Sequence, residues 1–183
     1  MTSHKFKDEL IRLISLEKMI ASQAQEPPAQ CRGPPPPVAN PHECCPIPSI
    51  FKDEEFEKCG FVKLEGANGP PAPRQGPPDC VKQLCILKNQ NLLKDEDAID
   101  TDALIAFIDK WAAENPSFEP VVGHVKERCI GKELPGPPEI CEANKLLFCL
   151  STTFYMECPI WVENDGCSKL KSHIEECKPY FLH

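Results

Sequence analysis

Twelve cysteines in a chain of 183 residues constrain the fold more than any other feature. No Cys-x-x-Cys pair occurs, and the closest non-adjacent pair, Cys80 and Cys85, has no matching second half, so the spacing does not suit structural zinc. An even number of well-spread cysteines predicts six disulfides formed in an oxidising compartment, and therefore a secreted protein. The cysteines are Cys31, Cys44, Cys45, Cys59, Cys80, Cys85, Cys129, Cys141, Cys149, Cys158, Cys167 and Cys177.

Cys44 and Cys45 are adjacent in the chain. Their Cα atoms must lie only about 3.8 Å apart, less than the roughly 4.4 Å that is the lower end for an unstrained disulfide. Consecutive side chains in an extended segment also point in opposite directions. We therefore predict that the two cysteines bond to two different partners and that they hold the surrounding proline-rich segment against a folded body.

Helical periodicity dominates the rest of the chain, and no segment shows sustained alternation of polar and apolar residues. The sequence predicts an all-α, disulfide-stapled domain of about six to eight helices. An amphipathic helix is expected at 4–20. On the helix at 80–91, the side chains of Cys80 and Cys85 should point about 140° apart and therefore bond to two different neighbours. The other predicted helices are 49–58, capped by Ser49 and ended by Gly60; 80–91, capped by Asp79; 101–115; 120–129, closed by Gly131; 139–158, buried around nearly its whole circumference; and 167–177, whose stripe is Cys167, Leu170, Ile174 and Cys177.

Composition divides the chain into three expected parts. Residues 1–24 form an amphipathic extension or a replaced leader, because 1–20 carries charges every few residues and lacks the apolar run of a signal peptide. Ser22 and Ala24 would suit cleavage just before Gln25. Residues 25–48 form a Pro-rich arm, with nine prolines between 27 and 48, and residues 49–183 form the helical domain.

The charge and the motifs exclude several functions. A net charge of −8 without a basic cluster makes nucleic acid a poor partner, and no run of about 18 apolar residues predicts a membrane span. The five histidines are scattered and lie in no known catalytic setting, so we expect no enzyme, no cofactor and no metal. The acidic run from Asp95 to Asp102 lacks the spacing of a calcium loop, and helix N-terminal electrostatics explains it better.

Three stretches resemble the insect odorant-binding proteins, specifically the cysteine-enriched Plus-C subgroup known from mosquitoes. They are DCVKQLCILKNQNLL at 79–93, VKERC at 125–129 and CEANKLLFCLSTTFYMECP at 141–159. Cys149, eight residues and Cys158 followed by Pro159 match the subgroup's Cys-x8-Cys-Pro pattern, and the added pair Cys167 and Cys177 and the CRGPPPP segment agree. One departure is the gap of four residues between Cys80 and Cys85, where the family usually has three.

The resemblance implies a disulfide pairing and a function. Its six-cysteine core implies Cys59 with Cys85, Cys80 with Cys149, and Cys129 with Cys158; the remaining six cysteines allow fifteen pairings, and the sequence does not choose among them. The implied function is a secreted carrier that takes a small hydrophobic odorant through sensillar lymph or haemolymph toward an odorant receptor.

The apolar helix faces could form a plain core or line a cavity, because both need the same residue types. If they line a cavity, the expected lining is Leu104, Ile105, Ile108, Trp111, Leu147, Phe148, Phe154 and Tyr155, with Trp111 or Tyr155 as a polar handle. The alternative is a secreted interaction or inhibitor module with a filled core, and the helix at 4–20 suggests a homodimer.

Overall fold

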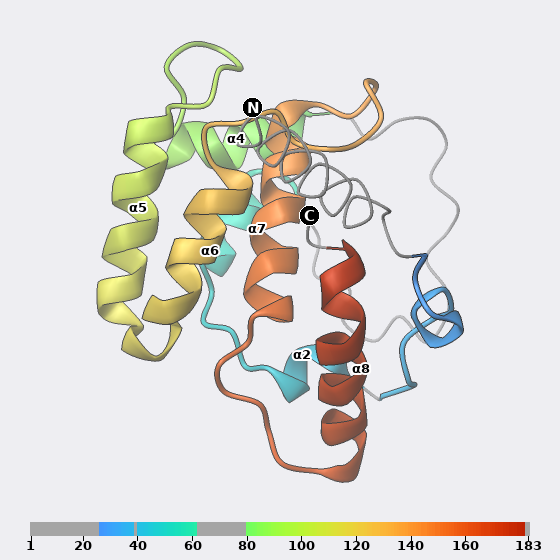
Figure 1. Cartoon of the computed structure of the whole chain (residues 1–183). Coiled ribbons are helices and arrows are strands. Elements are labelled where there is room, and N and C mark those ends of the chain that lie inside the picture. Colours follow the sequence, from blue (N-terminus) through green and yellow to red (C-terminus); the bar gives the residue numbers. More distant parts are fainter. Residues whose placement is uncertain (1–25, 39, 62–79, 182–183) are drawn as a thin grey trace, which may run out of the picture. The chain divides into compact units, whose positions relative to one another are not determined.

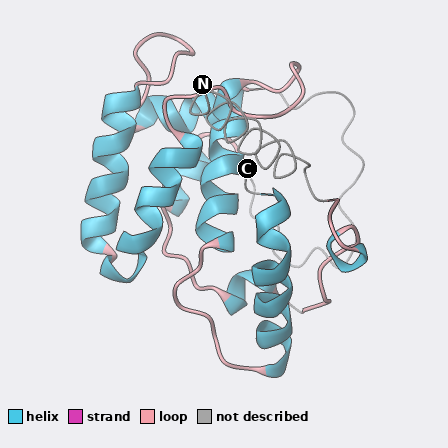
Figure 2. Ribbon diagram, viewed as in Figure 1, coloured by secondary structure: helices cyan, strands magenta, loops and turns pink. Residues whose placement is uncertain are grey.

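The computed structural model describes residues 26–38, 40–61 and 80–181, and within these ranges the chain is all-α. Figure 2 shows helices joined by loops, with no strand in the part of the chain that is described. The all-α prediction is therefore confirmed. The predicted helix at 4–20 and the cap at Asp79 lie outside the described residues. The helices are α2 (Pro41–Cys44), α3 (Asp53–Lys58), α4 (Val81–Asn89), α5 (Thr101–Glu114), α6 (Glu119–Cys129), α7 (Glu142–Met156) and α8 (Asp165–Phe181), with 3-10 turns η1 (Ala29–Cys31) and η2 (Pro116–Phe118).

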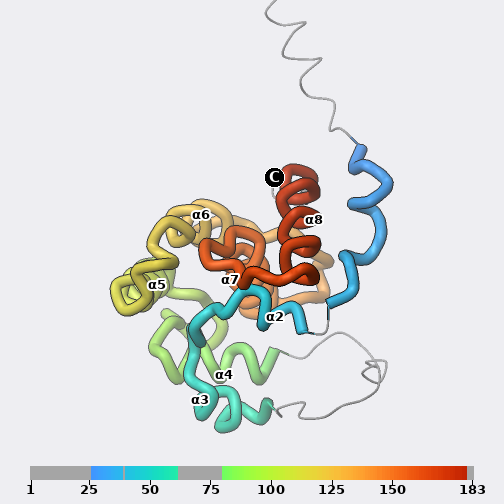
Figure 3. The backbone as a smooth tube through the Cα atoms, turned by 90° about the horizontal axis from the view of Figure 1, so that it is seen from below, coloured from blue at the N-terminus to red at the C-terminus, as the bar shows by residue number. Residues whose placement is uncertain are grey.

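The chain divides into two compact units: Val38–Ser168, and the residues on either side of it. In the larger unit α6 packs against α5 and α7, and α4 packs against α7 and α3. Figures 1 and 3 both show α5, α6 and α7 side by side. Together with α4 they form one core, because fully buried side chains from α4, α5, α6 and α7 belong to a single cluster. Among them are Ile86, Leu87, Leu104, Ile108, Val125, Leu146, Leu150 and Phe154.

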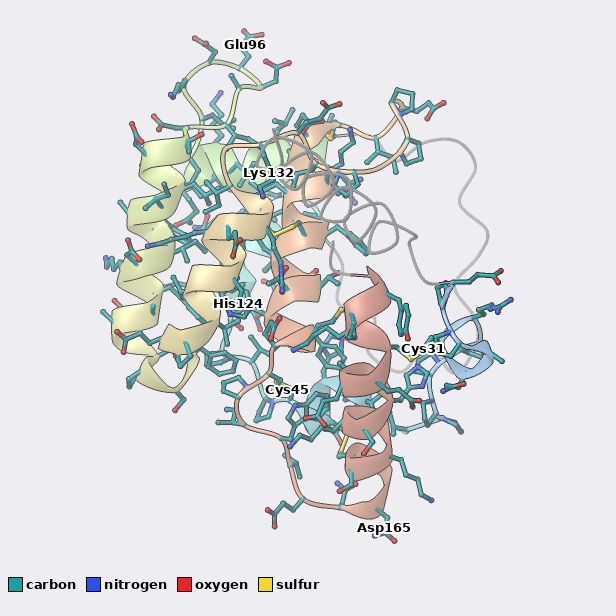
Figure 4. All side chains as sticks on the ribbon, in the orientation of Figure 1. Cys31, Cys45, Glu96, His124, Lys132 and Asp165 are labelled. Carbon is teal, nitrogen blue, oxygen red and sulfur yellow. A yellow bond between two sulfur atoms is a disulfide. The ribbon has the colours of Figure 1, made fainter. Side chains whose placement is uncertain are left out.

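Local capping explains where α5 begins and ends. The Asp100 carboxylate accepts hydrogen bonds from the backbone N–H groups of Asp102 (3.1 Å) and Ala103 (3.0 Å), which a helix N-terminus otherwise leaves without partners. The helix ends at Glu114, just ahead of Pro116. The predicted helix at 101–115 is confirmed to within one residue, and the Asp100 carboxylate at its start agrees with the helix N-terminal role expected for the acidic run. Glu96 lies at the outer tip of the preceding loop (Figure 4).

The helix predicted from Ser49 starts later, at Asp53, so the predicted cap was wrong. Ser49 instead lies in an extended connection, where its carbonyl oxygen accepts a hydrogen bond from Trp111 Nε1 at 3.2 Å. The predicted stop at Gly60 is confirmed: Gly60 has φ +79°, a left-handed conformation that favours glycine. The N–H groups of Gly60 and Phe61 donate to the carbonyls of Glu57 and Phe56, which completes a Schellman motif.

The helix α7 is shorter and less buried than predicted. It starts at Glu142 because Pro137 and Ile140 form a turn (3.1 Å) and Cys141 has an extended backbone. Only part of its circumference meets α4 and α6, and Phe148 is 70% exposed. The prediction of a helix buried on nearly all sides was therefore wrong, because apolar residues occupy faces that no other helix covers.

The structure pairs all twelve cysteines in six disulfides. Cys44 bonds to Cys167 and Cys45 bonds to Cys158, so the adjacent cysteines have two different partners, as predicted. Figure 4 labels Cys45. The pair Cys80 and Cys85 also diverges as expected, toward Cys141 and Cys59 respectively.

Two of the three core pairings expected from the family resemblance were wrong. Cys59 bonds to Cys85 as expected, but Cys80 bonds to Cys141 and Cys129 bonds to Cys149. The pairing order that the resemblance implied joins the first core cysteine to the third, the second to the fifth and the fourth to the sixth. This order is kept if Cys141 and Cys149 are counted as the fifth and sixth core cysteines. The error therefore lay in choosing Cys149 and Cys158 as the last two.

The surroundings of Cys158 explain that correction. Cys158 follows the end of α7 and reaches the segment before α3 through Cys45. At the end of α7, the residue that contacts α6 is Glu157, which directly precedes Cys158. Arg128 Nη1 and His124 Nδ1, both on α6, lie 2.6 Å and 3.1 Å from a Glu157 carboxylate oxygen. Figure 4 labels His124 on α6. Cys129 at the end of α6 bonds to Cys149, inside α7, with a Cα separation of 5.7 Å.

The smaller unit contains the described residues 26–37 and 169–181. Cys31 in η1 bonds to Cys177, with a Cα separation of 5.3 Å. Gln30 Nε2 donates a hydrogen bond to the Glu176 carboxylate. The last helix runs beyond the predicted 167–177 at both ends, and Cys167, Leu170, Ile174 and Cys177 are all buried, so the predicted stripe is confirmed.

Candidate functional site

An apolar groove of about 530 Å³ lies within the larger unit. Ligand pockets in proteins typically enclose about 300–1,000 Å³ and are mostly apolar, so this groove has the size and the chemistry of a small-molecule site. Its apolar lining is Ile47, Pro48, Ile50, Phe51, Phe56, Phe61, Leu147, Phe148, Leu150 and Phe154. Its polar lining is His42, Ser49, Gln83, Asn144, Ser151 and Tyr155.

Two walls of the groove come from distant parts of the sequence. One wall is the extended connection between α2 and α3, held by the Cys45–Cys158 disulfide and by the bond from Trp111 Nε1 to the Ser49 carbonyl. The other wall is a face of α7, where Asn144, Leu147, Phe148 and Ser151 follow helical spacing. Gln83 on α4 adds a polar group from a third element.

Aromatic rings make the wall around α3 rigid. Phe56 contacts Phe51 and Phe61 edge to face, with ring centroids 6.2 Å and 5.4 Å apart, and Phe51 stacks on Phe107 at 5.4 Å. Such pairs contribute about 0.5–1.5 kcal/mol each beyond the area that they bury. The groove is thus largely preformed rather than dependent on a ligand for its shape.

The donors of both predicted polar handles already have protein acceptors. Trp111 Nε1 donates to Ser49, and the Tyr155 hydroxyl donates to the Pro41 carbonyl at 3.1 Å. Burial raises the pKa of the Tyr155 phenol, because a low-dielectric surrounding disfavours the phenolate. Tyr155 therefore lines the groove as a neutral group whose proton is used to hold α2.

Four of the eight predicted lining residues come together in this groove: Leu147, Phe148, Phe154 and Tyr155. The other four lie on α5 and do not line it. Leu104 and Ile108 are fully buried, Ile105 is half-buried, and Trp111 packs on Phe118 and Phe154 with centroids 5.6 Å and 4.9 Å away. The α5 face is mainly core because α6 packs along it and Phe154 of α7 meets Trp111.

Sequence reasoning missed the contribution of the connection before α3. Ile47, Ile50 and Phe51 directly follow the double cysteine, and this position was the available signal. An apolar segment anchored at Cys45 must lie against the element that holds the other half of the disulfide. That element could be known only once Cys158, at the end of α7, was identified as the partner.

Two further cavities have more charged linings. One, of about 510 Å³, is lined in part by Lys52, Glu55, Lys110 and Glu114. The other, of about 450 Å³, is lined in part by Asp97, Lys132, Glu133 and Glu142, and Figure 4 labels Lys132. In contrast, no Asp, Glu, Lys or Arg of the described residues lines the apolar groove. The groove is therefore the site best suited to an uncharged apolar molecule.

The fold and the groove define the class: a small, all-helical protein stapled by disulfides, with an apolar groove between helices. The chain is homologous to general odorant-binding protein 67 of Anopheles gambiae, with 29% identity over 156 residues that cover 76% of this chain and 74% of the relative. It is also homologous to general odorant-binding protein 68 of the same mosquito, with 22% identity over 153 residues, or 75% and 70% of the two chains. No family model matches the chain.

The twelve cysteines in six disulfides fit the Plus-C pattern of odorant-binding proteins. The family resemblance expected from the sequence is therefore confirmed by the two relatives and by the disulfides. Across the described ranges, none of the helices has the length and apolar character needed to cross a bilayer.

Proposed function

We propose that this protein is a non-enzymatic carrier that binds a small hydrophobic ligand in the apolar groove and moves it through an aqueous secretion such as sensillar lymph or haemolymph. The observation that supports this most is the groove itself, preformed, about 530 Å³ in volume and lined by ten apolar residues. The homology to two odorant-binding proteins supports the same reading. Delivery to an odorant receptor belongs to the proposal, and self-association through the predicted helix at 4–20 stays a prediction.

Burial would supply the binding energy. Covering a small odorant removes roughly 500–600 Å² of apolar surface from water, counted on ligand and groove together, which corresponds to about 13–15 kcal/mol at ~25 cal/mol per Å². Association costs of about 4–15 kcal/mol reduce this sum. Affinities around the micromolar level, near 8 kcal/mol, lie within that range.

The proposal can be tested with an apolar naphthylamine dye, whose fluorescence reports transfer into the groove, and with Phe148→Ala. Phe148 lines the groove but is 70% exposed, so its truncation should change folding stability by less than about 0.5 kcal/mol. The dye's affinity should fall about fivefold, since an aromatic contact worth about 1 kcal/mol is lost.

Val81→Ala is the matched control. Val81 is 72% exposed on α4 and lines none of the three cavities described above, so dye affinity should not change. Unchanged affinity in Phe148→Ala as well would place the binding site elsewhere. No dye binding by the fully oxidised protein would favour the alternative, a secreted interaction or inhibitor module.

A further inference from the structure

The apolar groove and the cavity of about 510 Å³ share a partition. Three consecutive residues of the connection before α3, namely Ser49, Ile50 and Phe51, line both spaces. Ser49 is exposed, Ile50 is half-buried and Phe51 is 5% exposed, so the partition extends from the surface into the core. Because the same residues line both spaces, the groove is separated from its neighbour by a single segment of chain.

The Phe51 ring forms the buried part of this partition. It stacks on Phe107 with ring centroids 5.4 Å apart and planes 16° apart, and it meets Phe56 edge to face at 6.2 Å. Phe107 lines the 510 Å³ cavity and not the groove, whereas Phe56 lines the groove and not that cavity. The Phe51 ring therefore lies between a side chain of one space and a side chain of the other.

The main chain of the partition is held in place at two points. The Ser49 carbonyl accepts a hydrogen bond from Trp111 Nε1 at 3.2 Å, and the Cys45–Cys158 disulfide anchors the start of the segment. These bonds restrain the backbone on either side of Ile47 and Pro48. At the buried level, the size of the Phe51 side chain therefore decides whether the two spaces connect.

We propose that Phe51 is the specificity-determining residue of the groove for ligand length, because its ring closes the groove toward the 510 Å³ cavity. This inference rests on the proposed carrier function. A ligand gains affinity with each methylene group that it buries, about fourfold per group. The gain stops where the ring blocks further insertion, so the groove selects compact apolar molecules over long straight-chain ones.

The experiment measures displacement of the naphthylamine dye by straight-chain primary alcohols of increasing length. In the wild-type protein, affinity should rise about fourfold per methylene up to a limiting length and then stay level or fall. Phe51→Leu keeps an apolar side chain and removes the ring, so the limiting length should increase by about two methylenes. An alcohol of that greater length should bind about tenfold more tightly to Phe51→Leu than to the wild-type protein.

Phe118→Leu is the matched control. Phe118 is 1% exposed and lines none of the three cavities described above, so the same change there should leave the limiting length as in the wild type. Phe107→Leu is a second variant that does not alter Phe51 itself. It removes the stacking partner on the far side of the ring, so the ring can shift and the limiting length should increase by a smaller amount.

The outcomes separate this inference from the carrier function. If the dye does not bind the wild-type protein, the carrier function itself fails. If the dye binds but the wild-type protein shows no limiting length, or neither Phe51→Leu nor Phe107→Leu increases it, the role of Phe51 is overturned while the carrier function stands. An equal increase in Phe118→Leu overturns that role too, because a general loosening of the core would then explain the result.

Discussion

Removal of the Cys45–Cys158 disulfide should cost far less stability than its place in the sequence suggests. Its cysteines are 113 residues apart, and in the chain-entropy model a loop of that length corresponds to about 4.8 kcal/mol at 25 °C. The neighbouring bond from Cys44 to Cys167 offers a shortcut, however. Cys45 directly follows Cys44, and Cys167 lies nine positions after Cys158, so the closed loop spans about ten residues and contributes about 2.7 kcal/mol.

The same short loop applies to Cys44–Cys167 while Cys45–Cys158 remains intact. When both disulfides are absent, the loop that the first one closes is longer. The next covalent route runs through Cys31–Cys177, over about 33 residues, so the first closure then contributes about 3.7 kcal/mol. Loss of both bonds should therefore cost about 6.4 kcal/mol, about 1 kcal/mol more than the two single losses together. Packing losses from the missing sulfur atoms cancel in such a cycle.

The assay is guanidinium unfolding of four oxidised proteins: wild type, C45A/C158A, C44A/C167A and the combined variant, each with its remaining disulfides verified by peptide mapping. The Cys59–Cys85 bond, with a separation of 26 residues, is the control. No short covalent route links it to Cys45–Cys158, so the losses of unfolding free energy from removing these two bonds should add. Zero coupling between the adjacent bonds, or a loss near 4.8 kcal/mol or more for one bond alone, would refute the reasoning.

Two further predictions concern single side chains. Asp100→Ala should lower the free energy of unfolding by about 1 kcal/mol, because two N–H groups at the start of α5 lose their acceptor. Denaturant unfolding checks this, and Asp97→Ala in the preceding loop should have no comparable effect. Tyr155 should deprotonate above its ordinary pKa of 10.0, because burial raises its pKa. The stability that its neutral form provides is present below pH 10 and is lost as the pH rises through the raised pKa. In absorbance titration at 295 nm, the component removed by Tyr155→Phe should have its midpoint above 10; a midpoint at or below 10 contradicts the argument.

Helix limits were predictable where a local signal controls them. Pro116 ends α5 and Gly60 ends α3, since each acts through its own backbone geometry. The start of α3 was not predictable from Ser49, whose carbonyl is taken by Trp111, 62 residues away in the sequence. Similarly, nothing local to α7 showed that Phe148 faces solvent, because exposure depends on which helices pack nearby.

The sequence by itself determined an oxidised, helical protein and the divergence of Cys44 and Cys45. These properties follow from composition, from periodicity and from the short reach of one residue. Only the tertiary structure decided that Cys45 meets Cys158, that Cys80 meets Cys141, and that the connection before α3 lines a groove with α7. The physical reason is that spacing along a helix fixes the direction of a side chain, whereas its partner depends on packing between segments that are far apart in the chain.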